Sequence, residues 1–177
     1  MRRTIGMILA ALLAAGIVAV PEAAQAATSC SRSWHYITHA ETGLNLQPDP
    51  LQYQGNTTVY ADAVPGTNVW NQQFLFCRDP GWSPNHYAVY SNGTGRYWGE
   101  ANNIVHAGLD SITGAQMLFD IWKFDSNFWV IRYVGWPWYE KYLYPDHTPG
   151  YSHVLTMGQP PLTGNHLFRI SPANLLG

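Results

Sequence analysis

The histidines of this chain are the residues that first suggest a catalytic or metal site. His35 and His39 lie four positions apart in a run of residues typical of a β-strand. On a strand this spacing puts both side chains on one face, about 13 Å apart, whereas zinc ligands lie about 2 Å from their metal. The pair is therefore a poor chelate, and we expect it to be structural, as we do His147 and His153 near Asp146.

The sequence also lacks the short motifs that carry hydrolytic or phosphoryl-transfer chemistry. It contains no Gly-x-Ser-x-Gly elbow, no His-Glu-x-x-His motif and no phosphate-binding glycine loop. The sequence does not exclude a carboxylate pair of the glycoside-hydrolase type, because the two partners of such a pair meet only in the folded chain. We expect no catalytic residue, no metal and no cofactor, and therefore a chain that is not an enzyme.

A repeated motif of amide and apolar residues points to a structural role rather than to catalysis. NQQFLF at 71–76 returns as QMLFDI at 116–121 and as NHLFRI at 165–170. In each copy an amide side chain stands three places before a phenylalanine, and a large apolar residue follows two places after it. Such amides fix turns by bonding backbone groups that otherwise lack partners. The three sets are Asn71, Phe74 and Phe76, then Gln116, Phe119 and Ile121, and last Asn165, Phe168 and Ile170.

Short β-branched and aromatic runs, separated by Gly, Pro, Asn and Asp clusters, predict that the chain is mostly β. They recur in three units of about 45 residues with four strands each, a period that indicates repeated architecture. We expect the units at about 30–77, 78–121 and 122–171. Closing them about a threefold axis would remove exposed sheet edges. First and fourth strands would then form a barrel around the three phenylalanines, capped by the middle strands.

The first 26 residues have the features of a signal peptide. Two arginines precede an apolar stretch at 5–20, which is too short to span a bilayer comfortably, and a small-x-small cleavage site ends at Ala26. We therefore expect a signal peptide at 1–26. The remainder, 27–177, is expected to be one secreted, extracellular domain.

Charge and cysteine content narrow the possible partners. Removing Arg2, Arg3 and Glu22 from the 9 basic and 11 acidic residues leaves 7 and 10, a net charge of −3, and no basic run remains. That argues against a protein that follows nucleic-acid phosphates. In an oxidising compartment, Cys30 and Cys77 are expected to form a disulfide, rather than stay a free pair, and to tie the N-terminus to the barrel.

The arrangement resembles the β-trefoil, and specifically the ricin-B-type lectin domain. Units of that family end in Asn-Gln-x-Trp followed two residues later by an apolar residue, and NQQFLF matches with Phe74 in place of the tryptophan. The later copies keep the aromatic residue and replace the Gln by Met117 and His166. The resemblance covers nearly all of residues 30–170. It implies an all-β trefoil of three four-stranded repeats with pseudo-threefold symmetry.

Sugar sites of that family combine an early acidic residue, an aromatic platform and the Asn-Gln pair, because sugars present both hydroxyls and C–H faces. In the first unit the resemblance places the acidic position on Asn45 and the platform on Asp62, with Tyr60 two residues before it. With the amides Asn71 and Gln72, which are equally compatible with turn fixing alone, these are the expected carbohydrate-binding residues. The equivalents in the other units do not keep this chemistry: Trp98, His106, Gly108, Gln116 and Met117, and Leu143, Leu155, Met157, Asn165 and His166.

Aromatic residues in the third unit offer a possible second contact surface. The connection at 134–153 carries Trp136, Trp138, Tyr139 and Tyr142. Rigid rings on a loop make good contact area for a sugar or a protein. The alternative is that they seal the end of the barrel.

Functions of different classes are compatible with these features. The first is a secreted carbohydrate-binding, lectin-like module without catalytic activity, whose partner is a glycan or polysaccharide. The second is a trefoil protease inhibitor or other secreted protein-binding scaffold, which an exposed rigid loop would favour. A structural or toxin-associated subunit is the third. Neither nucleic acid nor a membrane is expected as a partner.

Overall fold

Thirteen β-strands and two short 3-10 helices make up the part of the chain that the computed structural model describes. This part comprises residues 28–49, 57–112, 117–135, 141–147, 154–158 and 162–175. The prediction of an all-β chain is confirmed. No helix within these ranges is long and apolar enough to cross a membrane.

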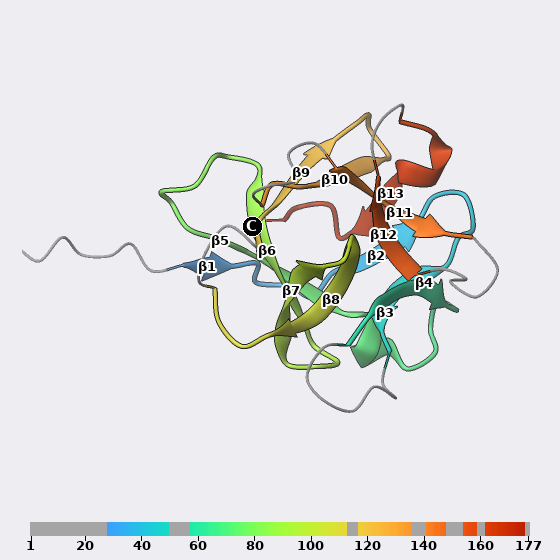
Figure 1. The fold of residues 1–177 in the computed structure, drawn as a ribbon, viewed down its shortest axis with the longest axis horizontal. Coiled ribbons are helices and arrows are strands. Elements are labelled where there is room, and N and C mark those ends of the chain that lie inside the picture. Colours follow the sequence, from blue (N-terminus) through green and yellow to red (C-terminus); the bar gives the residue numbers. More distant parts are fainter. Residues whose placement is uncertain are drawn as a thin grey trace, which may run out of the picture.

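Figure 1 labels the thirteen strands along the chain. The elements up to the end of the first expected unit are β1 (Ser29–Cys30), β2 (Tyr36–His39), β3 (Asn45–Pro48), β4 (Val59–Ala63), η1 (Val69–Gln72) and β5 (Phe74–Arg78). The next are β6 (His86–Ser91), β7 (Arg96–Ala101), β8 (Ile104–Leu109) and β9 (Phe119–Lys123). The last are β10 (Trp129–Tyr133), β11 (Lys141–Asp146), β12 (Val154–Gly158), η3 (Gly164–His166) and β13 (Phe168–Ser171).

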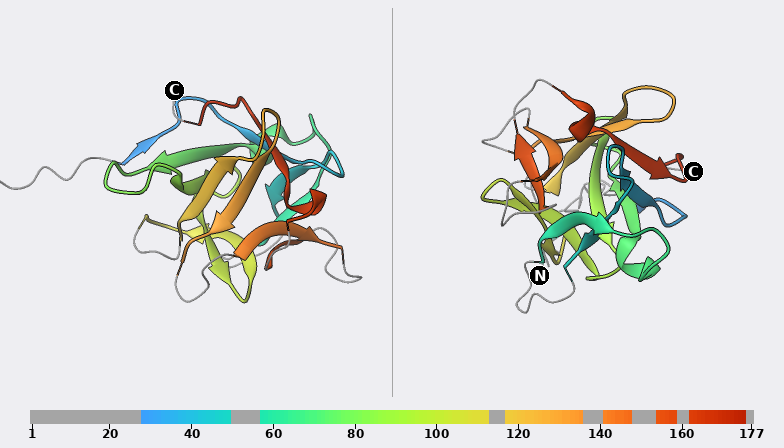
Figure 2. Two further views of the ribbon diagram at one scale, coloured as in Figure 1. Left: turned by 90° about the horizontal axis from the view of Figure 1, so that it is seen from above. Right: turned by 90° about the vertical axis from the view of Figure 1, so that its right-hand side faces the viewer.

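Six of the strands pair in a closed ring. β5 pairs with β6, β6 with β9, β9 with β10, β10 with β13, and β13 with β2, all antiparallel. A bridge between His35, just before β2, and Phe74 of β5 completes the ring. Figure 2 shows the C-terminal strand β13 beside β2. Closure of this kind pairs backbone groups that an open sheet edge would expose.

The remaining strands include three hairpins, β3–β4, β7–β8 and β11–β12, which meet one another at one end of the molecule. Each contact between hairpins is an antiparallel cross-strand pair, so the paired side chains share a face of the sheet. These contacts therefore decide which side chains from different hairpins come together. The pairs are Tyr60 with Val154, Ile104 with Thr156, and Thr58 with His106.

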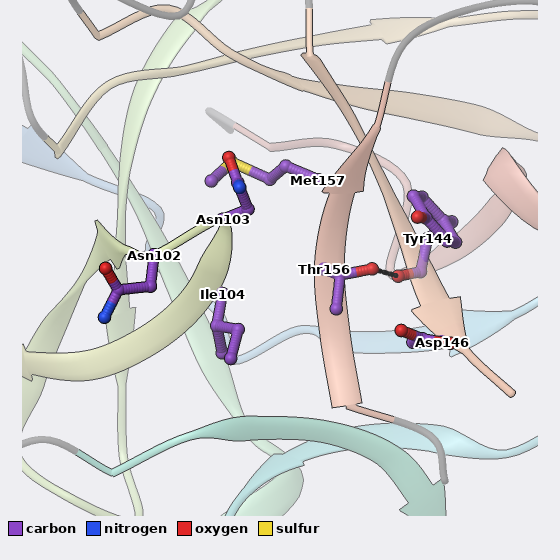
Figure 3. Close-up of a pocket in the computed structure, with 7 residues that line it drawn as sticks. All are labelled: Asn102, Asn103, Ile104, Tyr144, Asp146, Thr156 and Met157. Carbon is purple, nitrogen blue, oxygen red and sulfur yellow. Dashed lines mark hydrogen bonds between the residues drawn. The ribbon is translucent and has the colours of Figure 1, made fainter. Parts of the chain in front are cut away.

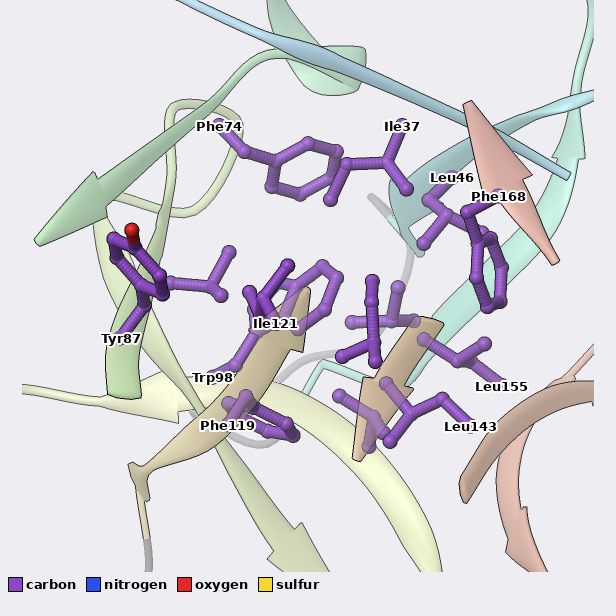
Figure 4. Packing of buried hydrophobic residues seen from close by; sticks show 14 of the residues in the cluster. Ile37, Leu46, Phe74, Tyr87, Trp98, Phe119, Ile121, Leu143, Leu155 and Phe168 are labelled. Carbon is purple, nitrogen blue, oxygen red and sulfur yellow. The ribbon is translucent and has the colours of Figure 1, made fainter. Parts of the chain in front are cut away.

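The three repeated phenylalanines lie in the core, as predicted. Phe74, Phe119 and Phe168 are fully buried, and the apolar residues two places after them are buried as well. Trp98 packs edge-on against two of them, with ring centroids 5.1 Å from Phe74 and 5.7 Å from Phe119 (Figure 4). Edge-to-face contacts stabilise aromatic pairs beyond the area they bury. Aromatic rings therefore contact one another in the core, among aliphatic side chains such as Ile37, Leu46 and Leu155.

The predicted disulfide is confirmed. Cys30 and Cys77 are bonded, and they also lie opposite each other where β1 pairs with β5. Both residues of β1 are exposed, so the strand gains little from burial. The covalent bond is therefore a principal fastening of this strand to the rest of the fold.

Candidate functional site

Two of the predicted binding residues, Asn45 and Gln72, hydrogen-bond to each other inside the protein. Asn45 Nδ2 donates to Gln72 Oε1 at 2.7 Å, and Thr38 Oγ1 donates to Asn45 Oδ1 at 2.6 Å. Gln72 Nε2 donates to the carbonyl oxygens of Val64, at 3.2 Å, and of Thr67. The exposed fractions are 3% for Asn45 and 0% for Gln72. These amides thus hold the turn before η1 against β3.

Asn71 is also buried, and it packs against the turn between β6 and β7. A Cβ atom on Gly93 would come within 2.6 Å of Asn71 Oδ1 and 3.0 Å of its Cα. Such a contact is too short without a shift of the backbone. Gly93 therefore allows the two turns to approach, and Asn71 occupies the junction between them.

Replacing Gln72 with alanine is expected to lower the free energy of unfolding by about 1–3 kcal/mol, because Asn45 and two backbone carbonyls would lose a buried partner. Denaturant unfolding of the single variants and of Asn45→Ala/Gln72→Ala measures the effect. The double variant should lose less than the sum, by about 0.5 kcal/mol or more. Strict additivity would contradict the bond between the two amides.

Tyr60 and Asp62 lie on the outer face of the β3–β4 hairpin. Alternate residues of β4 are buried, which leaves Tyr60 half-buried and Asp62 exposed. Gln47 of β3 lies opposite Tyr60, and its Nε2 donates to Asp62 Oδ1 at 3.0 Å. Burial raises the pKa of Tyr60, and the carboxylates of Asp49 and Asp62 raise it further. These effects favour the protonated form of the hydroxyl, which also hydrogen-bonds with the Thr58 side chain.

Gln47 was missed by the sequence analysis. It stands two residues after Asn45, and simple alternation would put both side chains on one face. A shift in register between Asn45 and Gln47 interrupts that alternation, as a β-bulge does. As a result Asn45 is buried while Gln47 is half-buried beside Asp62.

Trp98 and Leu143, which the resemblance placed at the acidic position of the other units, are core residues. Both are fully buried. In the strand pairings, the residues equivalent to Asn45 are Tyr97 and Tyr142. Asn45 lies opposite Thr38 of the preceding strand, just as Tyr97 lies opposite Tyr90 and Tyr142 lies opposite Arg132. A shift of one residue moves a side chain to the opposite face of a strand. The placement from the sequence was therefore one residue off in these two units.

The second predicted surface is only partly within the described ranges. Trp136, Trp138 and Tyr139 lie outside them. Tyr142 is half-buried on β11, and its ring stands edge-on to Trp122 with centroids 6.1 Å apart. Tyr142 thus belongs to an aromatic contact between β9 and β11.

His35 and His39 form hydrogen bonds with other groups of the protein. His35 Nδ1 lies 2.7 Å from the carbonyl oxygen of Pro172, and the ring nitrogens of His39 lie 3.0 Å from Thr42 Oγ1 and 3.2 Å from the Asn165 carbonyl oxygen. Burial lowers the pKa of both histidines. No group of three His, Cys, Asp or Glu among the residues described could hold a metal ion.

A pocket of about 280 Å³ opens between the β7–β8 and β11–β12 hairpins (Figure 3). It brings amide, carboxylate, hydroxyl and phenol groups together with two apolar side chains. Apart from the Asn-Asn turn signal, nothing local in the sequence marks these residues as neighbours. The lining consists of Asn102, Asn103 and Ile104 from the first hairpin and Tyr144, Asp146, Thr156 and Met157 from the second.

Comparisons with known proteins find likeness in fold but not in sequence. No protein-family model and no curated protein sequence matches this chain. A designed threefold-symmetric protein, ThreeFoil, superposes with a TM-score of 0.61 at 12% identity, over 77% of this chain and 96% of that one.

Two fungal lectins are similar in the same way. A ricin B-like lectin of Macrolepiota procera, solved with lactose, gives a TM-score of 0.56 at 17% identity, over 79% of this chain and 95% of that one. A Polyporus squamosus lectin, solved with a sialylated trisaccharide, gives 0.57 at 15% identity, over 79% of this chain and 49%, about half, of that one. The chain therefore has an all-β fold that is similar to those of β-trefoil proteins, including ricin B-like lectins.

Proposed function

We propose that this chain is a secreted, lectin-like module that binds carbohydrate without catalysis. The likeness in fold to ricin B-like lectins supports a carbohydrate-binding fold. The observation that carries the proposal is the outer face of β3–β4, where Tyr60 offers a ring, Asp62 a carboxylate and Gln47 an amide. Sugar recognition needs this combination of a stacking face and converging polar groups.

The same proposal includes a trefoil of three four-stranded units in one domain at 27–177. Its support is a four-residue ladder that recurs three times, each time running from the last strand of one unit across three strands of the next. A recurrent register of this kind is what pseudo-threefold symmetry requires. The ladders are Leu75–Tyr90–Tyr97–Leu109, Asp120–Arg132–Tyr142–Gly158 and Arg169–Thr38–Asn45–Ala63.

Within the predicted site, we assign different roles to surface and buried residues. Tyr60 and Asp62 would contact the sugar, together with Gln47. Asn45 and Gln72 would position the hairpin and the turn beneath the site, since their side chains are buried and bonded to each other. Asn71 would act in the same way at the neighbouring turn.

Replacing Asp62 with alanine is expected to abolish detectable sugar binding at this face. A single small site binds on the millimolar scale, about −4 kcal/mol. Loss of a charged acceptor costs about 1.5–3 kcal/mol of that. Glycan-array screening of the 27–177 protein, followed by titration calorimetry on the best ligand, measures the loss.

Asp110→Ala is a matched control, because Asp110 is an exposed carboxylate on another hairpin that pairs only at the surface, with Arg96 at 3.3 Å. Its removal should leave sugar binding unchanged. If both variants bind like the wild type, the β3–β4 face does not hold the sugar. If no glycan binds the wild-type protein, the proposed function is wrong.

A protein-binding scaffold, such as a protease inhibitor, is the alternative that one observation favours. The turn before and within η1 exposes Val64, Val69 and Trp70, with 55% of Trp70 exposed. Gln72 holds this turn in one shape through its bonds to Val64 and Thr67, and a pre-ordered loop loses little entropy on binding. Inhibition of a serine or cysteine protease that Trp70→Ala removes, without any glycan binding, would establish this function instead.

A further inference from the structure

The pocket between the hairpins has one wall fixed by a tight turn. Asn102 and Asn103 connect β7 to β8 and both have positive φ, 56° and 65°, as a two-residue type I′ turn requires. The Asn103 amide nitrogen donates to Glu100 Oε1 at 2.8 Å, and its carbonyl oxygen accepts from Met157 N at 2.9 Å. Lys141 Nζ donates to its side-chain oxygen. The turn is therefore fastened to both strands of the opposite hairpin.

Two rows of side chains connect this pocket to the face that carries Tyr60. In one row, Thr156 of β12 lies between Ile104 of β8 and Tyr144 of β11. Antiparallel partners share a face, and so do residues two apart on one strand. The neighbouring row on that face consists of Tyr60 of β4, Val154 of β12 and Asp146 of β11.

The row of Tyr60, Val154 and Asp146 links the outer face of the β3–β4 hairpin to the pocket. Tyr60 and Asp146 are two strands apart, which corresponds to about 10 Å between them. Asp62 lies two residues beyond Tyr60 on the same face. The half-buried and exposed side chains thus follow one another from Asp62 past Tyr60 to Asp146 and Tyr144, with Val154 and Thr156, both buried, between them.

The chemistry of the pocket suits part of a sugar chain. Its volume, about 280 Å³, lies just below the range for drug-sized ligand sites, about 300–1,000 Å³, and so suits one sugar unit. Asp146 and Asn102 can bond hydroxyls, while Ile104 offers apolar contact to C–H groups. The exposed carboxylate of Asp62 disfavours an acidic ligand at the Tyr60 end of the surface through like-charge repulsion.

We propose that the pocket is a saccharide subsite continuous with the Tyr60 face, so that the ligand is an uncharged oligosaccharide spanning the β3–β4 and β11–β12 hairpins. This inference rests on the proposed function. One sugar unit occupies the pocket beside Asp146, and a following unit lies against Tyr60. The site is thereby built by three units of the fold, whereas the carbohydrate-binding residues selected from the sequence all belong to one.

The test compares oligosaccharides with their own monosaccharides. An array of uncharged and acidic glycans identifies the best ligand for the protein, and calorimetry then measures its affinity at one, two and three units. Affinity should rise by about tenfold or more with the second unit, the gain expected for added hydrogen bonds and apolar contact. Asp146→Asn and Asn102→Gly should each remove most of that gain, and acidic glycans should bind more weakly.

Asn68→Gly is the matched control for Asn102→Gly. Asn68 also has positive φ, 42°, in an exposed turn, and glycine adopts that conformation without strain, so binding should not change. Equal loss in Asn68→Gly, or pocket variants that bind like the wild type while Asp62→Ala loses binding, would overturn the subsite and leave the proposed function standing. An affinity independent of chain length would do the same. Absence of all glycan binding would overturn both.

Discussion

Replacing Phe119 with alanine is expected to lower the free energy of unfolding by about 3–5 kcal/mol. Phe119 is fully buried, and its ring centroid lies 5.7 Å from those of Trp98 and Tyr133. Removing the ring takes away its transfer free energy and leaves a cavity that the closed barrel cannot easily collapse, because paired strands on all sides hold the walls apart. Equilibrium unfolding in urea, followed by tryptophan fluorescence, measures the loss.

Phe124→Ala provides the control for this experiment. It removes the same side chain just beyond the same strand, but 55% of Phe124 is exposed. Its effect should stay within about 0.5 kcal/mol, as for most surface substitutions. Similar losses from both variants would mean that Phe119 does not occupy the core position assigned to it, and the equivalence of the three phenylalanines would fail with it.

Removing the disulfide is expected to cost about 2–5 kcal/mol. The bond joins residues 47 positions apart, and closing a long loop restricts the unfolded chain more than closing a short one. In the native protein, the bond also holds β1, whose two residues are exposed, against β5. The double variant Cys30→Ala/Cys77→Ala should therefore unfold at lower denaturant concentration.

Reductant supplies the internal control for the disulfide. A thiol reductant should lower the unfolding midpoint of the wild-type protein and leave the double variant unaffected. Peptide mapping without reduction should recover Cys30 and Cys77 in one linked fragment. Two free thiols, or a wild-type midpoint insensitive to complete reduction, would contradict the role given to this bond.

The buried amides suggest how a sugar-binding pattern can persist in a chain that uses it differently. An Asn and a Gln near a turn can bond ligand hydroxyls or backbone carbonyls, since both are donors and acceptors of similar geometry. In this protein, Asn45 and Gln72 bond each other and the turn at Val64 and Thr67. Sugar contact at the outer face of the hairpin, as proposed above, would therefore come from Tyr60, Asp62 and Gln47.

Local patterns in the sequence were enough to predict the features that depend on a few neighbouring residues. Short β-branched and aromatic runs with turn residues between them predicted an all-β chain, because strand formation is encoded in segments of a few residues. The recurrent phrase around Phe74, Phe119 and Phe168 predicted three buried rings. The presence of two cysteines, at the two ends of the first expected unit, predicted the disulfide between them.

The register of the strands could not be predicted from the sequence. Sliding a strand by one residue moves each side chain to the other face, and a local irregularity at Asn45 and Gln47 decides which of them faces outward. The family resemblance therefore placed the acidic position on Trp98 and Leu143, where the strand pairings put Tyr97 and Tyr142.

The neighbours of the Asn102–Asn103 turn depend on contacts between hairpins that are distant in the sequence. Two consecutive asparagines are a local turn signal, but their neighbours Tyr144, Asp146 and Thr156 come from a hairpin far along the chain. Those groups meet because β12 pairs with both β8 and β4, and contacts between hairpins follow from closure of the whole barrel. Pairing of that kind leaves no periodic trace in either segment, so the pocket and its link to Tyr60 appear only in the folded molecule.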